Sequence, residues 1–175
     1  MHPSFHSQNR IPMNIPSTQL IDEVGSLLES GITEVFSTML GMDVKIVAPE
    51  AIRESKEPFV AASVGFVGDV SGMVYIYLRA SLARALAIRF LNLTNADADD
   101  DELTGDAIGE LSNMIVGAAK SRLCDLGLAC ALTIPSIMRG QSLSAKPVCS
   151  SESLQLTIDC DGELILVELF MKPTV

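Results

Sequence analysis

Polar side chains recur on one side of a helix predicted over residues 102–126. At about 100° per residue, positions three and four apart share a face, and this face carries Asp106, Glu110, Asn113, Gly117 and Lys120. Glu110 could bind a cation through its carboxylate, and Asn113 could both donate to and accept from a water molecule. A surface with these side chains could act on a partner.

The same spacing also occurs on helices that merely face water, so the residue types must decide between the two interpretations. Asn113 is a poor helix former and costs roughly a few tenths of a kcal/mol in mid-helix. Gly117 costs about 1 kcal/mol relative to alanine, and it leaves room where a partner could approach. These costs favour a docking surface.

Periodicity in the first half predicts a long amphipathic helix, a strand hairpin and a short helix. The long helix should begin at Ser17, end at Gly41 and be kinked near Gly31. The strands are expected at Val44–Val47, Phe59–Val67 and Met73–Leu78, and the short helix from its cap Ser81 to Leu93.

The second half is predicted to repeat this order. Acidic residues from Asn95 to Glu102 suit the positive end of the helix that follows, and Gly127 should end that helix. The remaining segments are a strand over Ala129–Met138, a loop over 141–151, and a hairpin of Leu154–Cys160 and Glu163–Met171 that turns at Asp161-Gly162.

The two long helices align at a constant offset. Glu34 falls opposite Glu110, Gly41 opposite Gly117, and Ser37 opposite Asn113. Two such units would bury a helix stripe and a sheet face against each other. We therefore expect an α+β, pseudo-duplicated sandwich of two long helices on a largely antiparallel sheet, plus a short helix.

Composition limits the classes of partner. The chain has 175 residues and a formal net charge of −10, which would repel nucleic acid and anionic membrane surfaces. We expect a flexible arm over 1–16, a single domain over 17–175, and a cytoplasmic location because no membrane span or signal peptide is evident. The four cysteines contain no CxxC pair, so reduced thiols and no metal site are expected.

The stretch Asp106-xxx-Glu110-xx-Asn113, within Ala-Ile-Gly-Glu-Leu-Ser-Asn-Met-Ile-Val-Gly, resembles the active-helix signature of the CheC/CheX/FliY phosphatase family. The first helix, with Glu34-Val-Phe-Ser-Thr-Met-Leu-Gly, is similar to that of the CheX branch. In the family a proline follows some twenty residues later, here Pro135. Because Ser37 replaces a second asparagine, one active helix is expected, which favours CheX over CheC.

The resemblance implies a chemotaxis or two-component phosphatase that removes phosphate from the aspartyl phosphate of a CheY-like response regulator. It implies that Glu110 docks against the regulator's lysine and that Asn113 orients the hydrolytic water. Asp106 and Gly117, on the same helix face, are expected to be binding residues for the partner. No cofactor of its own is implied, since the Mg²⁺ would sit in the regulator. CheX relatives are often dimers, which leaves a homodimer open.

Two other interpretations remain open on the residues. A non-catalytic scaffold of the chemotaxis or flagellar switch apparatus could use the same helix face, although it would not require an asparagine three residues after a glutamate. An α+β domain whose stripe is merely solvated is the plainest alternative.

Overall fold

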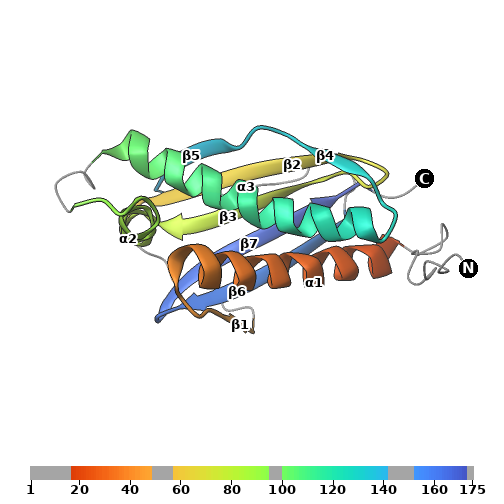
Figure 1. The fold of residues 1–175 in the computed structure, drawn as a ribbon, viewed down its shortest axis with the longest axis horizontal. Coiled ribbons are helices and arrows are strands. Elements are labelled where there is room, and N and C mark those ends of the chain that lie inside the picture. The colour runs from red at the N-terminus through yellow and green to blue at the C-terminus, as the bar shows by residue number, and fades with distance from the viewer. Residues whose placement is uncertain (1–16, 49–56, 95–99, 142–151, 173–175) are drawn as a thin grey trace, which may run out of the picture.

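The computed structural model describes residues 17–48, 57–94, 100–141 and 152–172. Two long helices lie side by side on one face of a sheet, and a short helix lies near one end of them (Figure 1). This confirms the predicted α+β sandwich.

The elements in chain order are α1 (Ser17–Val35), the π-helical turn η1 (Phe36–Leu40), β1 (Lys45–Val47), β2 (Phe59–Gly68), β3 (Gly72–Arg79), α2 (Ala80–Leu91), α3 (Asp101–Asp125), β4 (Cys130–Leu132), β5 (Ser136–Gly140), β6 (Glu152–Cys160) and β7 (Glu163–Met171).

The sheet is antiparallel at every described pairing, in the order β1-β6-β7-β3-β2-β4, with β5 also paired to β2. Its order reflects the predicted duplication. If the strands that follow α1 are exchanged for those that follow α3, the order maps onto its own reverse, with β3 beside β7 at the centre. Two copies of one helix-and-strands unit would give this arrangement.

The core lies between the helices and the sheet. Successive strand residues point to opposite faces, so every second residue of the central strands faces the helices. Val64, Val74 and Leu169 are in register across β2, β3 and β7 and are buried. Leu28 of α1 and Ile108 of α3 are buried in the same core.

Gly31 allows α1 and α3 to approach each other closely. A Cβ atom at Gly31 would lie 2.9 Å from the carbonyl oxygen of Ile115 on α3. The α-helix continues through this glycine to Val35, so the expected kink near Gly31 does not interrupt it, and the π-helical turn η1 follows. Gly41 then ends the helix at φ 59°, as predicted.

The expected cap of α2 is wrong. The residue before the helix is Arg79, in an extended conformation and without a side-chain cap bond, so Ser81 lies inside the first turn. Its backbone N–H donates to Oε1 of Glu57 at 2.5 Å. Hydrogen bonds from Ser81 lower the pKa of the Glu57 carboxyl and outweigh the opposing effect of burial. The Glu57 carboxylate, which precedes β2 in the chain, thus accepts a hydrogen bond from a free N–H group in the first turn of α2.

The hairpins and the ends of α3 are as predicted. Strands β2 and β3 pair directly, and β6 and β7 turn at Asp161-Gly162, where both residues have positive φ. Asp100 caps α3, and Gly127 follows its end at φ 88°. The predicted arm 1–16, residues 95–99 of the acidic loop and the loop 142–151 lie outside the described residues. Among the helices described, none is both long and apolar enough to cross a membrane.

Candidate functional site on helix α3

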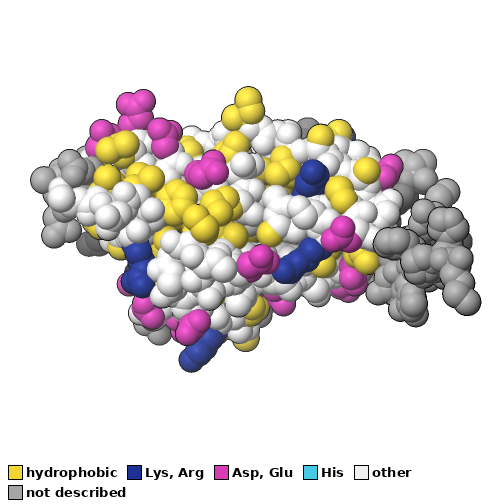
Figure 2. Space-filling model, viewed as in Figure 1, with side chains coloured by type: hydrophobic (Ala, Val, Ile, Leu, Met, Phe, Trp, Pro, Cys, Tyr) yellow, Lys and Arg dark blue, Asp and Glu magenta, His cyan; other side chains and the backbone are white. Residues whose placement is uncertain are grey.

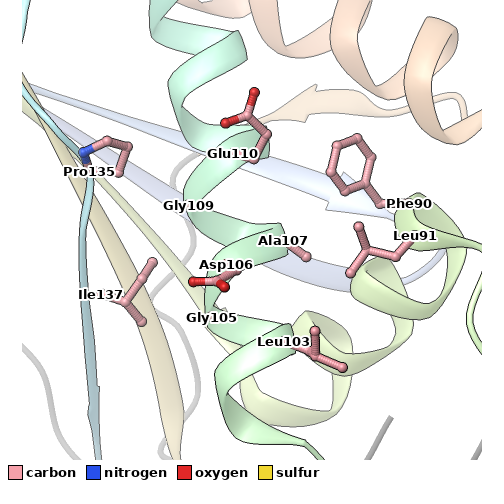
Figure 3. Close-up of a pocket in the computed structure, with 10 residues that line it drawn as sticks. All are labelled: Phe90, Leu91, Leu103, Gly105, Asp106, Ala107, Gly109, Glu110, Pro135 and Ile137. Carbon is pink, nitrogen blue, oxygen red and sulfur yellow. The ribbon is translucent and has the colours of Figure 1, made fainter. Parts of the chain in front are cut away.

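The sequence-predicted site residues lie on one helix, α3. Asp106 and Glu110 are exposed, whereas Asn113 and Gly117 are half-buried. Figure 3 shows the Asp106 and Glu110 side chains projecting from α3 one turn apart. We call Asp106, Glu110, Asn113 and Gly117 the stripe. It forms one side of the helix, while the buried Ile108, Leu111 and Ile115 belong to the core.

Several contacts fix α3 in place. Oδ1 of Asp100 accepts from the backbone N–H groups of Glu102 and Leu103, at 2.8 and 3.2 Å. At the other end the N–H of Gly127 donates to the carbonyl of Cys124 and the N–H of Leu128 to that of Leu123, which satisfies two terminal carbonyls. A capped, well-packed helix is a rigid support for the stripe.

Small residues bring α3 close to strand β5. A Cβ atom at Gly109 would lie 3.6 Å from Cδ1 of Ile137 and 3.8 Å from Cβ of Pro135, and one at Gly105 would lie 3.6 Å from Cγ2 of Ile137. The Arg139 guanidinium also donates to the carbonyl oxygen of Asp101 in the first turn of the helix. Pro135, the proline expected from the resemblance, therefore lies beside the stripe. It is next to Gly109, which is about one helical turn from Asn113.

The stripe has an apolar flank on each side. Figure 3 places Pro135 and Ile137 of the β5 side to one side of α3, and Phe90 and Leu91 of α2 to the other. A hollow of about 540 Å³ includes both flanks and both carboxylates. Its lining residues are Phe90, Leu91, Leu103, Gly105, Asp106, Ala107, Gly109, Glu110, Pro135 and Ile137. In Figure 2 hydrophobic side chains gather where α2 meets α3, with acidic side chains near the start of α3.

The strand predicted over 129–138 is interrupted beside the stripe. Phe66 pairs with Leu132 in β4, and Ser63 pairs with Ser136 in β5, so the segment 133–135 opposes only two residues of β2. The one extra residue is a β-bulge, which bends a strand and redirects its side chains. The bulge presents Ile134, whose exposed fraction of 88% is the highest among the large hydrophobic side chains that the structure describes.

The counterpart of the stripe on α1 has a different environment. Glu34, which aligns with Glu110, accepts from Nη2 of Arg122 on α3 at 2.7 Å. Ser37, which aligns with Asn113, lies in the π-helical turn η1 and not in a regular α-helix. The structure thus brings the predicted residues together on α3 and not on α1.

Within the described part of the chain, no group of three His, Cys, Asp or Glu side chains could hold a metal ion. The stripe offers one carboxamide, two carboxylates and apolar flanks. This combination can dock a cationic and partly apolar surface and orient a water molecule brought with it.

A helix pair on an antiparallel, pseudo-duplicated sheet, with a polar signature on one helix, defines the CheC-like class of α+β proteins. A family model described as chemotaxis phosphatase CheX matches residues 60–159, and the chain belongs to this family. No curated protein sequence matches the chain significantly.

Solved structures share the fold. CheX from Desulfovibrio desulfuricans is 25% identical, with a TM-score of 0.73 over 86% of this chain and 99% of that one. CheX from Borrelia burgdorferi, in a complex with CheY, BeF₃ and Mg²⁺, is 21% identical, with a TM-score of 0.70 over 85% of this chain and 97% of that one. FliY from Thermotoga maritima is 18% identical, with a TM-score of 0.63 over 87% and 88% of the two chains.

Some residues around the stripe were missed at the sequence level. The apolar flanks and the bulge residue Ile134 join segments far apart in the chain. A signal for the bulge was present, because a proline inside a strand marks an edge or a bulge, and Pro135 interrupts the predicted strand. Gly105 and Gly109 are another such signal: two glycines four residues apart lie on one face of a helix and let a neighbouring element approach closely.

Proposed function

We propose that this protein is a phosphatase for a phosphorylated CheY-like response regulator. The single observation that carries the proposal is the placement of Asp106, Glu110 and Asn113 on one accessible side of a firmly capped helix, beside Pro135. Membership of the CheX family supports this activity. The complex of the Borrelia burgdorferi relative with CheY supports the class of partner.

The reaction is hydrolysis of an acyl phosphate on the regulator. Water attacks phosphorus, the bond from phosphorus to the aspartyl oxygen breaks, and the products are inorganic phosphate and a free carboxylate. The regulator supplies its own Mg²⁺ and lysine, so the phosphatase must position the water. Asn113 is suited to this, because a neutral carboxamide both donates and accepts and does not repel the phosphoryl oxygens.

Glu110 supplies attraction at the edge of the same contact. An exposed carboxylate one helical turn from Asn113 can accept a charge-assisted hydrogen bond from the regulator's lysine. Holding that lysine fixes the distance between Asn113 and the phosphoryl group. Asp106, one turn further from Asn113, would extend the acidic surface toward other cations of the partner.

The test is phosphate release from a phosphorylated CheY-like regulator after removal of the phosphodonor. Wild type should accelerate release, and Asn113→Ala should abolish the acceleration while the Kd for the regulator changes little. Glu110→Ala should weaken binding and turnover together. Glu23→Ala, which removes an exposed carboxylate from α1, is the matched control and should behave as wild type. Release that is unchanged in Asn113→Ala would refute the catalytic role.

A non-catalytic adaptor is the second candidate, because the fold is shared with FliY from Thermotoga maritima and a shared fold does not by itself establish catalysis. It predicts that the wild-type protein binds the regulator without accelerating phosphate release. The same assay separates the two, since binding and release are measured on the same samples.

A further inference from the structure

We propose that Ile134 is an apolar docking residue that determines affinity for the phosphorylated response regulator. This inference rests on the proposed function and extends it to a residue outside the signature. It concerns the β-bulge 133–135, whose central side chain is 88% exposed. A single exposed isoleucine is ordinary on a protein surface, so its position and rigidity must carry the argument.

The position is set by contacts along α3. A Cβ atom at Gly117 would lie 3.9 Å from Cδ1 of Leu132, and one at Gly109 would lie 3.8 Å from Cβ of Pro135. The segment between these contacts therefore passes the helical turn that carries Asn113. Ile134 lies in that segment, so it is next to the turn that would meet the phosphoryl group.

The bulge is also held firmly. The N–H of Thr133 donates to the carbonyl of Gly65, and the N–H of Gly65 donates to Oγ1 of Thr133, both at 2.8 Å. The Thr133 hydroxyl thus replaces the acceptor that the bulge removes from the ladder. On the other side Pro135 has a fixed φ and restricts Ile134 to extended conformations. Because the backbone around Ile134 is already fixed, this segment loses little conformational entropy on binding.

The chemistry of the surface indicates one occupant. Asp106 and Glu110 can attract a cation, and Pro135 and Ile137 form an apolar flank of the same hollow. Ile134 adds an exposed apolar side chain next to Pro135. The complementary surface is a lysine with an apolar depression beside it. Because the lysine of the proposed regulator would pair with Glu110, the depression would lie on that same regulator, against Ile134.

The experiment compares Ile134→Ser with Val67→Ser. Val67 is also β-branched and 60% exposed, but it follows the buried Phe66 in β2 and so points to the sheet face away from the helices. Both variants are assayed for phosphate release over a range of regulator concentrations, with the Kd for the regulator measured in parallel. Thermal unfolding and sedimentation of each variant accompany the assays.

Ile134→Ser should raise KM and Kd about tenfold, which corresponds to ~1.4 kcal/mol of lost contact, and leave kcat within about twofold. Ile134→Leu should restore most of the affinity, and Val67→Ser should match wild type. Equal KM and Kd in Ile134→Ser and wild type would overturn the proposal, as would a changed oligomeric state in place of a changed affinity.

The failure of the two proposals can be told apart. If wild type binds the regulator but does not accelerate release, the proposed activity fails, and the Kd comparison still decides the role of Ile134. If wild type accelerates release and Ile134→Ser does so with the same KM, only the docking inference fails. If wild type neither binds nor accelerates, both are overturned.

Discussion

Glu34 of α1 and Arg122 of α3 form an ion pair at 2.7 Å across the two halves of the pseudo-repeat. Glu34 aligns with Glu110, so the counterpart on α1 of the carboxylate proposed to dock the regulator is paired internally with an arginine. Ser37, which aligns with Asn113, lies in the π-helical turn that follows. We therefore expect no second site on α1, for two reasons: the charge of Glu34 is paired, and the backbone at Ser37 is π-helical.

Restoring the missing asparagine should accordingly fail to create a second site. In an Asn113→Ala background, Ser37→Asn should give no phosphate release above the regulator alone. Adding Arg122→Ala frees Glu34, but the π-helical turn still displaces residue 37, so release should stay at the background rate. Recovery of activity in the triple variant would show that charge pairing alone had silenced α1.

The same arginine offers a modest prediction for stability. The Arg122–Glu34 pair is partly exposed, with exposed side-chain fractions of 37% and 54%. Exposed ion pairs contribute roughly 0.2–1 kcal/mol. Arg122→Ala should lower the free energy of unfolding by no more than about 1 kcal/mol in urea denaturation, and a larger loss would indicate that the arginine stem also supports the packing of α1 on α3.

Replacing Gly117 by alanine should make the protein more stable and its binding of the regulator weaker. A Cβ atom there would meet only Cδ1 of Leu132, at 3.9 Å, which is ordinary contact. Because alanine is the better helix former, Gly117→Ala should raise the free energy of unfolding by about 1 kcal/mol. If the glycine makes room for the regulator, KM should rise at the same time. A more stable variant with unchanged KM would remove Gly117 from the docking surface.

Gly31 provides the contrasting case. The same substitution there places Cβ 2.9 Å from the carbonyl oxygen of Ile115 and 3.4 Å from Cβ of Ala118. The helices would have to move apart, at a cost of roughly 1–3 kcal/mol. Gly31→Ala should therefore lower the urea midpoint despite its better helix propensity. Equal midpoints for Gly31→Ala and wild type would show that α1 and α3 can separate at little cost.

The sequence was sufficient for the regular parts of this fold, because their signals are local. The helical period, the glycines at helix ends and the Asp161-Gly162 turn act within a few residues, and the structure agrees with each of them. The stripe on α3 was predictable for the same reason. Its residues lie on one helix, so spacing alone brings them together.

The remaining features depend on segments distant in the chain. Ser81 carries a good capping side chain, but its N–H donates to Glu57, which precedes β2, and the helix begins at Ala80, two residues earlier than a Ser81 cap requires. The bulge at 133–135 depends on the register of β4 and β5 against β2. The pairing of Glu34 with Arg122 spans the duplication. These contacts join segments that are distant in the chain, so the local propensities of the residues do not predict them.

Cys160 makes stability sensitive to alkaline pH. Burial, together with the nearby Asp161 and Asp159 carboxylates, raises the pKa of this thiol from 9.0 to about 11. Between these values the unfolded chain loses the proton and the folded chain keeps it. Its contribution to stability is therefore complete below pH 9.0 and falls as the pH rises toward about 11.

The measurement is the urea midpoint of wild type and Cys160→Ala at about pH 8 and about pH 10.5. The variant will be less stable at both, because it leaves a cavity in the core. The informative quantity is the loss on going to the higher pH, which should be larger for wild type. Equal losses in the two proteins would assign the alkaline sensitivity to other groups.

Glu110 should make the reaction with the regulator dependent on salt. A carboxylate at an exposed contact attracts a lysine through a charge interaction that added salt screens, with a Debye length of about 10 Å at 0.1 M. KM for the phosphorylated regulator should therefore rise with NaCl concentration in wild type. Glu110→Gln keeps the size of the side chain and removes the charge, so its KM should be higher at low salt, by about tenfold, and should rise less steeply as salt is added.

Glu23→Gln, on the exposed side of α1, retains the wild-type slope if the effect is local. The same slope in wild type and Glu110→Gln, with the slope reduced in Glu23→Gln, would mean that the overall charge of the protein and not the stripe attracts the regulator.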